Sequence, residues 1–324
     1  MDVRKLNRGL IELAVSQGIR EIRQDTKRGL RRLSDLGQYF ASRRFSENIF
    51  LQIHEVLKQE DSRYYHLIQN VLDYVEEDTI KCFGINLGYN SWTYGVSVIR
   101  QRFQEQKLQG KKNAKPVSWL CELPYNSEKG DPSERINHLS SLINRKQQEG
   151  VYTYALYPQQ TFAQNPELVF LLDRHPDCDF LWFFRESDLT EAQLKVLKKH
   201  NNCIYLFPAI KEDGTADVEI AGKMKENRIL YSYYYIYEEA EGGLEKVLEE
   251  IQPVLQEDPS ILIMKAGPGV SEEYRAGFAR EIWNDRMHPG HNTFLAELTE
   301  DSRRIDEMIA GERVQRDEIR GDSE

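Results

Sequence analysis

Residues 179–184 read Asp-Phe-Leu-Trp-Phe-Phe, a short run in which every residue after the aspartate is large and apolar. A continuous apolar run without polar alternation is typical of a strand that is buried on both faces of a parallel sheet. Six other short apolar runs occur between residues 82 and 264. The seven runs together span residues 82–87, 117–123, 151–157, 179–184, 203–207, 229–237 and 261–264.

Amphipathic segments with helical spacing separate these runs, for example at residues 132–149, 190–200 and 244–255. Gly150 follows the first of these helices as a good C′ residue, and Thr190 before Glu191 is a credible helix start. Strands that alternate with helices predict an α/β fold with a parallel sheet. We therefore expect a partial or full parallel (βα) TIM-like barrel.

The first part of the chain shows a different pattern. Residues 1–80 contain no proline, and their apolar residues recur at helical spacing, as in Leu10, Leu13 and Ala14. The last twenty residues are rich in charge. The sequence thus predicts a helical N-terminal domain over residues 1–80, a barrel domain over 81–300, and a charged, flexible tail over 301–324.

Composition limits the classes of partner. The net charge of −10 argues against nucleic acid as a partner of the chain as a whole. Residues 1–50 carry a net +5, and a basic helix face is expected there. This face either stays in solvent or docks on the acidic barrel, or it contacts RNA, an anionic membrane or an acidic partner. Its residues are Arg20, Arg23, Lys27, Arg28, Arg31 and Arg32.

The cysteines and the N-terminus bear on the compartment. The four cysteines are far apart in sequence, without CxxC or zinc-type spacing. The charged N-terminus lacks the apolar segment of a signal peptide, and no run is long enough to span a membrane. We therefore expect a cytoplasmic protein with free thiols and no bound metal.

Function in a parallel barrel is expected where the strands end, because side chains from different strands converge there. The predicted ligand-binding residues, each at or beyond a strand end, are Asn90, Tyr94, Glu122, Arg185 and Lys265. One carboxylate, two cations, an amide and a phenol suit a polar ligand with a carboxylate and a donor group, such as an amino acid or a peptide end. The alternative is a solvated rim of ion pairs.

Three other segments hold polar residues at short spacing. Residues 84–95, Gly-Ile-Asn-Leu-Gly-Tyr-Asn-Ser-Trp-Thr-Tyr-Gly, form either a ligand-binding loop or a tightly packed structural loop. Ser271 is expected to be a helix N-cap rather than part of an anion site. Asp285, His288 and His291 are three potential metal ligands, but Pro289-Gly290 breaks the helix between the histidines.

The order of elements, with a strand ending in Cys121-Glu122-Leu123-Pro124, resembles the first half of radical S-adenosylmethionine (SAM) enzymes. Glu122 and Pro124 match that family's Gly-Gly-Glu-Pro-like motif. The family's CxxxCxxC loop after the first strand is missing, since residues 88–95 contain no cysteine. The resemblance therefore implies a degenerate relative with no iron–sulfur cluster and no cofactor.

Three functions follow from these observations. The first is a non-catalytic, radical-SAM-like barrel that binds a peptide, a protein or a small polar ligand as an accessory or regulatory protein. The second is a barrel enzyme with acid/base or lyase chemistry that uses Glu122, Arg185, Glu186 and Lys265. The third is a nucleic-acid or membrane accessory that works through the basic helix. Whether the chain is an enzyme stays open at this point.

Overall fold

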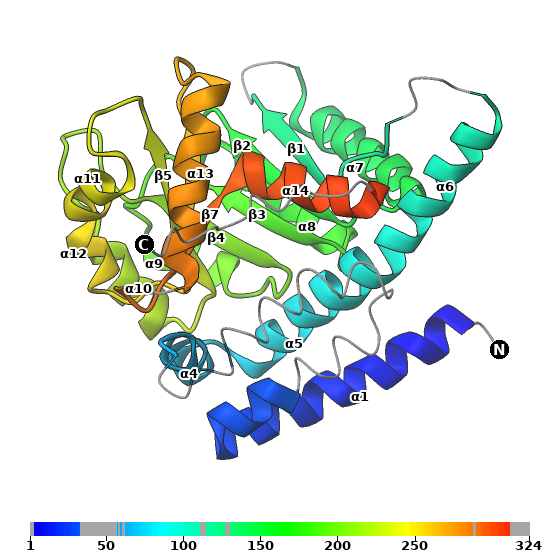
Figure 1. Cartoon of the computed structure of the whole chain (residues 1–324), viewed down its shortest axis with the longest axis horizontal. Helices are drawn as coiled ribbons and strands as arrows, with labels where there is room; N and C mark the ends of the chain where they lie inside the picture. Colours follow the sequence, from blue (N-terminus) through cyan, green and yellow to red (C-terminus); the bar gives the residue numbers. More distant parts are fainter. Residues whose placement is uncertain are drawn as a thin grey trace, which may run out of the picture.

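The computed structural model describes residues 3–32, 57, 59, 62–110, 115–126, 130–287 and 290–311. Its centre is a seven-stranded sheet whose strands follow one another in chain order, and all neighbouring strands are parallel (Figure 1). The strands are β1 (Leu120–Tyr125), β2 (Thr153–Pro158), β3 (Asp179–Phe183), β4 (Cys203–Pro208), β5 (Tyr231–Tyr237), β6 (Ile261–Ala266) and β7 (Phe294–Glu297).

Helices connect the strands. Because a parallel pair needs a crossover, each strand is followed by at least one helical segment before the next strand. These helices are α7 (Pro132–Glu149), α8 (Val169–Arg174), α9 (Glu191–Leu197), α10 (Glu219–Glu226), α11 (Gly243–Glu250), α12 (Gln252–Leu255) and α13 (Glu272–Met287). The sheet with its crossovers is a half-barrel. This confirms the predicted parallel α/β class, but it does not confirm a closed barrel.

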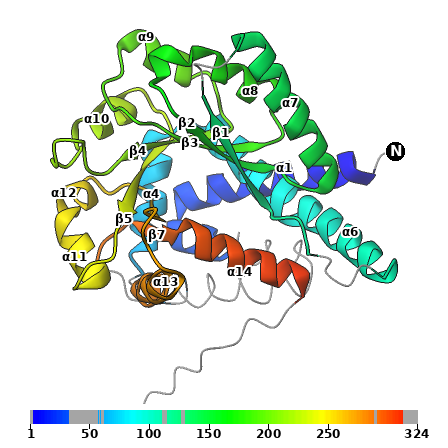
Figure 2. The same ribbon diagram turned by 90° about the horizontal axis from the view of Figure 1, so that it is seen from above.

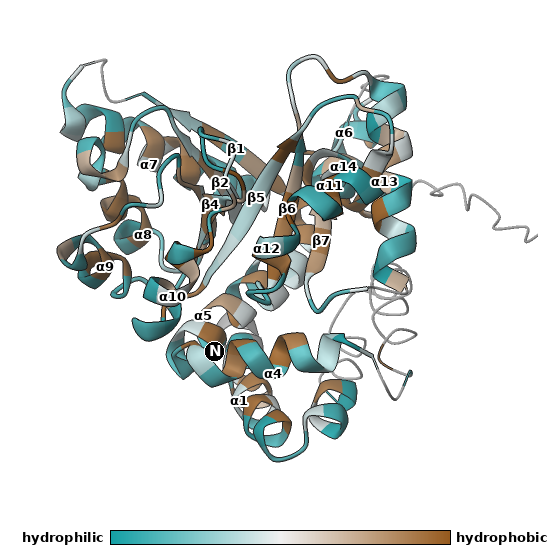
Figure 3. Ribbon diagram, turned by 90° about the vertical axis from the view of Figure 1, so that its left-hand side faces the viewer, coloured by the Kyte–Doolittle hydropathy of each residue, from teal (hydrophilic) through white to brown (hydrophobic). Residues whose placement is uncertain are grey.

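Strand register separates the two faces of the half-barrel. Glu122 pairs with Ala155, and Ala155 pairs with Leu181, so these three side chains lie on one face, here called the inner face. The outer face carries the alternate residues, such as Tyr154 and Trp182, and the crossover helices cover it. Figure 3 shows hydrophobic residues concentrated on strands such as β4 and β6 and on the helix surfaces that are turned toward the sheet, whereas the tyrosine-rich β5 is pale.

The outer core is the larger of the two and is strongly aromatic. Trp182, Phe184 and Tyr205 are almost fully buried and pack ring against ring, with centroids 5.2 to 6.1 Å apart. Burying a large apolar side chain contributes about 1.5–3 kcal/mol. The tyrosines at 231, 233 and 237 belong to the same core, so the alternating Tyr residues of β5 mostly pack under helices.

One predicted strand is wrong. Residues 82–87 are helical and lie across the boundary between α5 (Glu77–Ile85) and the π-helix η1 (Asn86–Gly95), which continues into α6 (Val96–Leu108). Six predicted runs match β1 to β6. Strand β7 was not predicted, because a run of four residues is too short to show the alternation of a strand. A short apolar run such as Cys-Phe-Gly-Ile is compatible with either a strand or a buried helix.

The local signals at the helix ends agree with the sequence. Gly150 ends α7 with a positive φ of 99°, which glycine adopts without strain. Thr190 caps α9 in a capping box with Gln193. The predicted helix 244–255 is instead two helices, α11 and α12, and Pro253 lies in the first turn of the second.

Helix α14 (Leu298–Ala310) runs from the end of β7 toward the beginning of β1 (Figure 2). The backbone N–H of Trp119, just before β1, donates to Asp306 at 3.0 Å, and Arg100 of α6 donates to the carbonyl of Ile309 at 3.0 Å. Residues 301–311, expected to belong to a flexible tail, thus complete α14 and its Gly311 cap. The rest of that segment lies outside the described residues.

The N-terminal helices α1 (Val3–Gln24) and α4 (Tyr64–Tyr74) share a small core that includes Ile19, Ile22 and Tyr65. Within the described residues, the expectation of helix before residue 80 is confirmed. Val75 and Ile80, however, also pack against the inner face of the sheet. A separate N-terminal domain, and the limits 1–80, 81–300 and 301–324, stay predictions.

Candidate functional site

The inner face has two different halves along the strand direction. At the amino ends of the strands, α4 and α5 cover it with the side chains of Val71, Tyr74 and Phe83. Toward the carboxyl ends the inner face reaches solvent, and Glu122 and Ile236 are exposed. This solvent-facing half is called the carboxyl end of the inner face.

Lys265 of β6 extends across the inside of the half-barrel. Its Nζ lies 3.6 Å from the centroid of the Tyr157 ring on β2, although three strands separate β2 from β6 in the sheet. An ammonium over an aromatic face is stabilised by the ring quadrupole. Among the described residues, Lys265 has neither a hydrogen-bond acceptor nor a carboxylate within ion-pair distance.

Two electrostatic effects act on the Lys265 amine. Partial burial lowers its pKa, because a low-dielectric surrounding disfavours the charged form. The negative charge of Glu122 opposes this shift, so the two groups sense each other without a direct contact. Glu122 is exposed on β1, and its carboxylate makes no hydrogen bond or ion pair with the described residues. The carboxyl end of the inner face thus holds an amine and a carboxylate that form no ion pair with the described residues.

Aromatic rings lie between these charged groups. Tyr157 stacks on Phe183 with centroids 4.5 Å apart, and Phe183 meets Tyr234 of β5 edge to face at 5.2 Å. The Tyr157 hydroxyl is buried without a hydrogen-bond partner among the described residues, whereas the Tyr234 hydroxyl donates to the Phe184 carbonyl at 2.9 Å. These three rings form one apolar row, here called the aromatic row.

Arg185 lies just after β3 beside the aromatic row. Its Nη1 donates to the carbonyl of Gln159 at 2.8 Å, and its side chain is exposed. Burial raises the pKa of Tyr234 to about 12, and the positive charge of Arg185 partly opposes this shift. Arg185 forms no ion pair with the described residues, so it is available to an anion.

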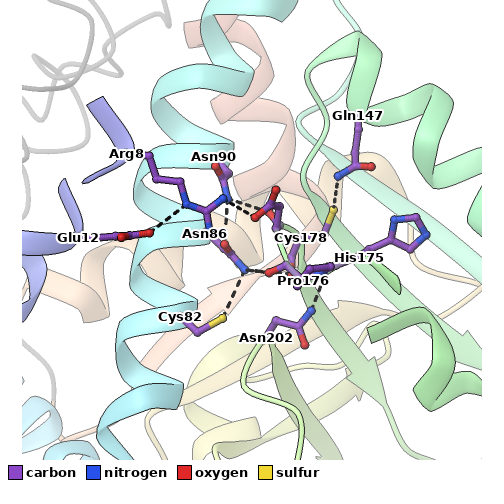
Figure 4. Close-up of polar contacts among 11 residues, drawn as sticks. Arg8, Glu12, Cys82, Asn86, Asn90, Gln147, His175, Pro176, Cys178 and Asn202 are labelled. Carbon is purple, nitrogen blue, oxygen red and sulfur yellow. Dashed lines mark hydrogen bonds and ion pairs between the residues drawn. The ribbon is translucent and has the colours of Figure 1, made fainter. Parts of the chain in front are cut away.

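Asn90 and Tyr94 are at the opposite end of the sheet. Asn90 is fully buried in η1, and its Nδ2 donates to Asn86 and to the carbonyl of Asp177, just before β3 (Figure 4). The Tyr94 ring packs against Tyr152, which precedes β2. The structure therefore brings Glu122, Arg185 and Lys265 to one end of one face and separates Asn90 and Tyr94 from them.

Tight backbone packing explains why residues 88–95 are not an open loop. A Cβ on Gly95 would lie 2.3 Å from the carbonyl oxygen of Gly150, so only glycine permits this approach. Ser91 and Thr153 share a 2.6 Å hydrogen bond in the same contact. The polar side chains of residues 88–95 hold η1 against the segments around the starts of β2 and β3. This agrees with the interpretation of the stretch as tightly packed and structural rather than ligand-binding.

The other candidate motifs contribute little to a site. Ser271 accepts from the backbone N–H of Tyr274 at 3.2 Å, as expected for an N-cap. His291 lies 3.2 Å from Asp285, while His288 is outside the described residues. In the part of the chain that the structure describes, no group of three potential metal ligands comes together.

Much of the predicted basic face contacts the protein itself. Arg23 pairs with Glu77 at 3.3 Å, Arg32 pairs with Glu21 at 2.7 Å, and Arg31 donates to the carbonyl of Leu57 at 3.1 Å. Nearer the N-terminal end of α1, Arg8 forms an ion pair with Asp177 next to β3. Contact of this face with an external partner stays a prediction.

The sequence argument missed Tyr157, Phe183 and Tyr234. It considered residues that follow each strand, but these three point inward from within β2, β3 and β5. The signal was present in the alternation along each run, since Tyr157 lies two residues after Ala155 and therefore on the same face.

No protein-family model and no curated protein matches the sequence. Three crystal structures of SuiB from Streptococcus suis are similar in fold. The S-adenosylmethionine-bound one has 8% identity over 61% of this chain and 51% of SuiB, with a TM-score of 0.45. The one bound to precursor peptide SuiA has 12% identity over 61% and 53%, with a TM-score of 0.42. A third has 9% identity over 75% and 65%, with a TM-score of 0.41.

This chain thus spans about half to two thirds of the length of the SuiB chains. Among the described residues, no helix is both long enough and apolar enough to cross a membrane.

Proposed function

We propose that the carboxyl end of the inner face binds a small ligand that carries both a carboxylate and an amine, such as an amino acid or a peptide end. The observation that carries this proposal is the Lys265 ammonium, which lies across the inside of the half-barrel without an ion-pair partner among the described residues. An unpaired, half-buried charge is costly unless a ligand or solvent compensates it.

The charges on this surface suit a zwitterion. Arg185 and Lys265 provide two cations for a carboxylate, and Arg185 can form a two-pronged hydrogen bond to it. Glu122 provides an acceptor for an amine. The aromatic row offers a flat apolar surface for the ligand's carbon skeleton. Of the predicted ligand-binding residues, Glu122, Arg185 and Lys265 remain in this proposal, and Asn90 and Tyr94 act in the fold.

We further propose that this chain works without an iron–sulfur cluster. Such clusters need thiolates, and burial opposes thiolate formation in all four cysteines. Burial raises the pKa of Cys82 to about 11, and it raises that of Cys121. The pKa values of Cys178 and Cys203 lie well above the ordinary value for the same reason. A binding or accessory role of a radical-SAM-like barrel is compatible with these thiols.

Thermal-shift and calorimetric titrations with free amino acids and dipeptides test the binding proposal. Free forms should raise the melting temperature, and N-acetylated or C-amidated forms should do so less, because each modification removes one charge. Glu122→Gln should weaken binding of the free amine selectively, and Arg185→Ala should weaken binding of the free carboxylate.

Matched control variants lie on the outer helix α11, where Glu245→Gln and Lys246→Met alter the same charges on exposed positions. These controls should bind like the wild type. The proposal is wrong if no probe shifts the melting temperature, or if both inner-face variants bind every probe as well as the controls do.

The alternative function, a barrel enzyme with acid/base or lyase chemistry, is favoured by a specific feature. The amine of Lys265 and the carboxylate of Glu122 influence each other electrostatically, and neither is neutralised by a described neighbour. A pair of this kind can move a proton between a bound ligand and the protein.

A further inference from the structure

The amine of Lys265 has the surroundings that a carbonyl-reactive lysine needs. It is half-buried on the inner face, and no described carboxylate holds it as an ammonium in an ion pair. The Tyr157 ring under its Nζ stabilises the charged form, whereas partial burial favours the neutral amine. A lysine becomes nucleophilic when a desolvating, partly apolar surrounding favours the neutral amine. Most surface lysines lack this property because water stabilises their charge.

We propose that Lys265 condenses with the carbonyl group of a small aldehyde or ketone that carries a carboxylate, and forms an imine on the inner face. This inference rests on the proposed function, because it uses the same surface and names the chemical class of its ligand. Glu122 is the proton acceptor and donor of the step, and Arg185 binds the carboxylate.

The condensation needs no oxidant or reductant. Glu122 takes one proton from the Lys265 ammonium, and the freed nitrogen pair attacks the carbonyl carbon, whose π electrons move to oxygen. Proton transfer to that oxygen gives a carbinolamine. Its C–O bond then breaks as the nitrogen pair forms the C=N bond, and water leaves with a proton returned by Glu122. The products are the protonated imine and one water molecule, and Glu122 ends as it began.

Three features of the site support this chemistry. Glu122 is exposed, so the released water can leave and protons can exchange with solvent. Glu122 and Lys265 share the inner face, and the Lys265 Nζ rests on Tyr157 of β2, the strand that pairs with β1 of Glu122. The aromatic row beside Lys265 holds a carbon skeleton next to the amine, while Arg185 near Tyr234 sets the position of a carboxylate.

Borohydride trapping tests the inference. The full chain is incubated with pyruvate or with succinate semialdehyde, two probes that differ in the spacing between carbonyl and carboxylate, and the imine is reduced with sodium borohydride. Peptide mapping by mass spectrometry then locates the adduct. We expect the reduced adduct mainly at Lys265, and we expect at least about a tenfold slower formation in Glu122→Gln.

Lys265→Arg retains the positive charge but cannot form an imine, so it should lose the adduct and keep the thermal shift with carboxylate probes. Lys246→Arg on α11 is the matched control and should trap like the wild type. Because the wild-type map alone reports the site, the test does not depend on the folding of a variant.

Adducts spread evenly over surface lysines, or undiminished labelling in Lys265→Arg, would overturn the inference. If trapping fails while amino acids or dipeptides still shift the melting temperature, only the imine step is wrong. If trapping and all thermal shifts fail together, the proposed binding function is wrong as well.

Discussion

The two ends of the half-barrel use polar residues in opposite ways. At the amino end, Asn86 and Asn90 are buried, the Asn90 amide donates to the Asn86 side-chain oxygen, and both amides donate to the carbonyls of residues 176–178 (Figure 4). At the carboxyl end, Glu122 and Lys265 have no hydrogen bond or ion pair to the described residues. Polar side chains are therefore structural at one end and available to a ligand at the other.

Whether a polar side chain has partners in the fold indicates its role better than its residue type does. A buried amide with satisfied donors stabilises the fold, because leaving any of its partners unpaired is costly. A charge that has only a ring and solvent around it contributes little to folding and can interact with a ligand. Substitutions at the amino end should therefore change stability, whereas those at the carboxyl end should change binding.

The largest expected effect is at Asn86. Replacing it with alanine removes the donor to the carbonyls of Pro176 and Cys178 and the acceptor for Asn90, all in a buried place. We expect Asn86→Ala to lower the free energy of unfolding by about 3 kcal/mol, as measured by urea denaturation. Asn284→Ala, an exposed position on α13, is the control and should change little. Equal stabilities of the two variants would contradict the structural role of the amino end.

An intermediate effect is expected from Asp179, which is fully buried at the start of β3. Burial raises its pKa well above the ordinary value, and the nearby Asn86 amide opposes the shift. A carboxyl group with a raised folded-state pKa contributes stability below its unfolded pKa, and that contribution is lost as pH rises through the folded-state pKa. The wild type should therefore lose stability with rising pH, by up to about 1.4 kcal/mol per pH unit in that window.

Asp179→Asn has no proton to lose and should remove this component of the pH dependence. Urea midpoints measured from about pH 4 to pH 8 compare the two proteins over the range above the ordinary Asp pKa. The thiol of Cys82, whose pKa burial raises to about 11, should not titrate there. Parallel stability profiles for wild type and variant would show that Asp179 does not titrate as its burial requires.

The smallest stability effects are expected at the carboxyl end. Glu122 and Arg185 are exposed, and of the two only Arg185 has a described side-chain hydrogen bond, to a backbone carbonyl. Glu122→Gln and Arg185→Ala should each alter the free energy of unfolding by no more than about 0.5–1 kcal/mol. Calorimetric or chemical unfolding measures this. A loss as large as that of Asn86→Ala would mean that these charges hold the fold together, and the difference between the two ends would disappear.

Sequence patterns predicted most of the architecture. Runs such as 179–184 identified six of the seven strands, and Gly150 and Thr190 marked helix ends because caps depend on local backbone chemistry. Three of the five predicted ligand-binding residues lie at the carboxyl end of the inner face. Asn90 and Tyr94 do not, because their placement depended on reading residues 82–87 as the first strand.

The sequence by itself determined the parallel α/β class, the order of β1 to β6, and the polar side chains at the strand ends, since burial periodicity and capping are local. Only the tertiary structure decided that residues 82–95 are helical, that the sheet stays a half-barrel, and that Lys265 reaches the ring of Tyr157. The physical reason is that a short apolar run can be buried as either a strand or a helix. Which form it takes, and which distant side chains meet, depends on the surfaces that the rest of the chain presents.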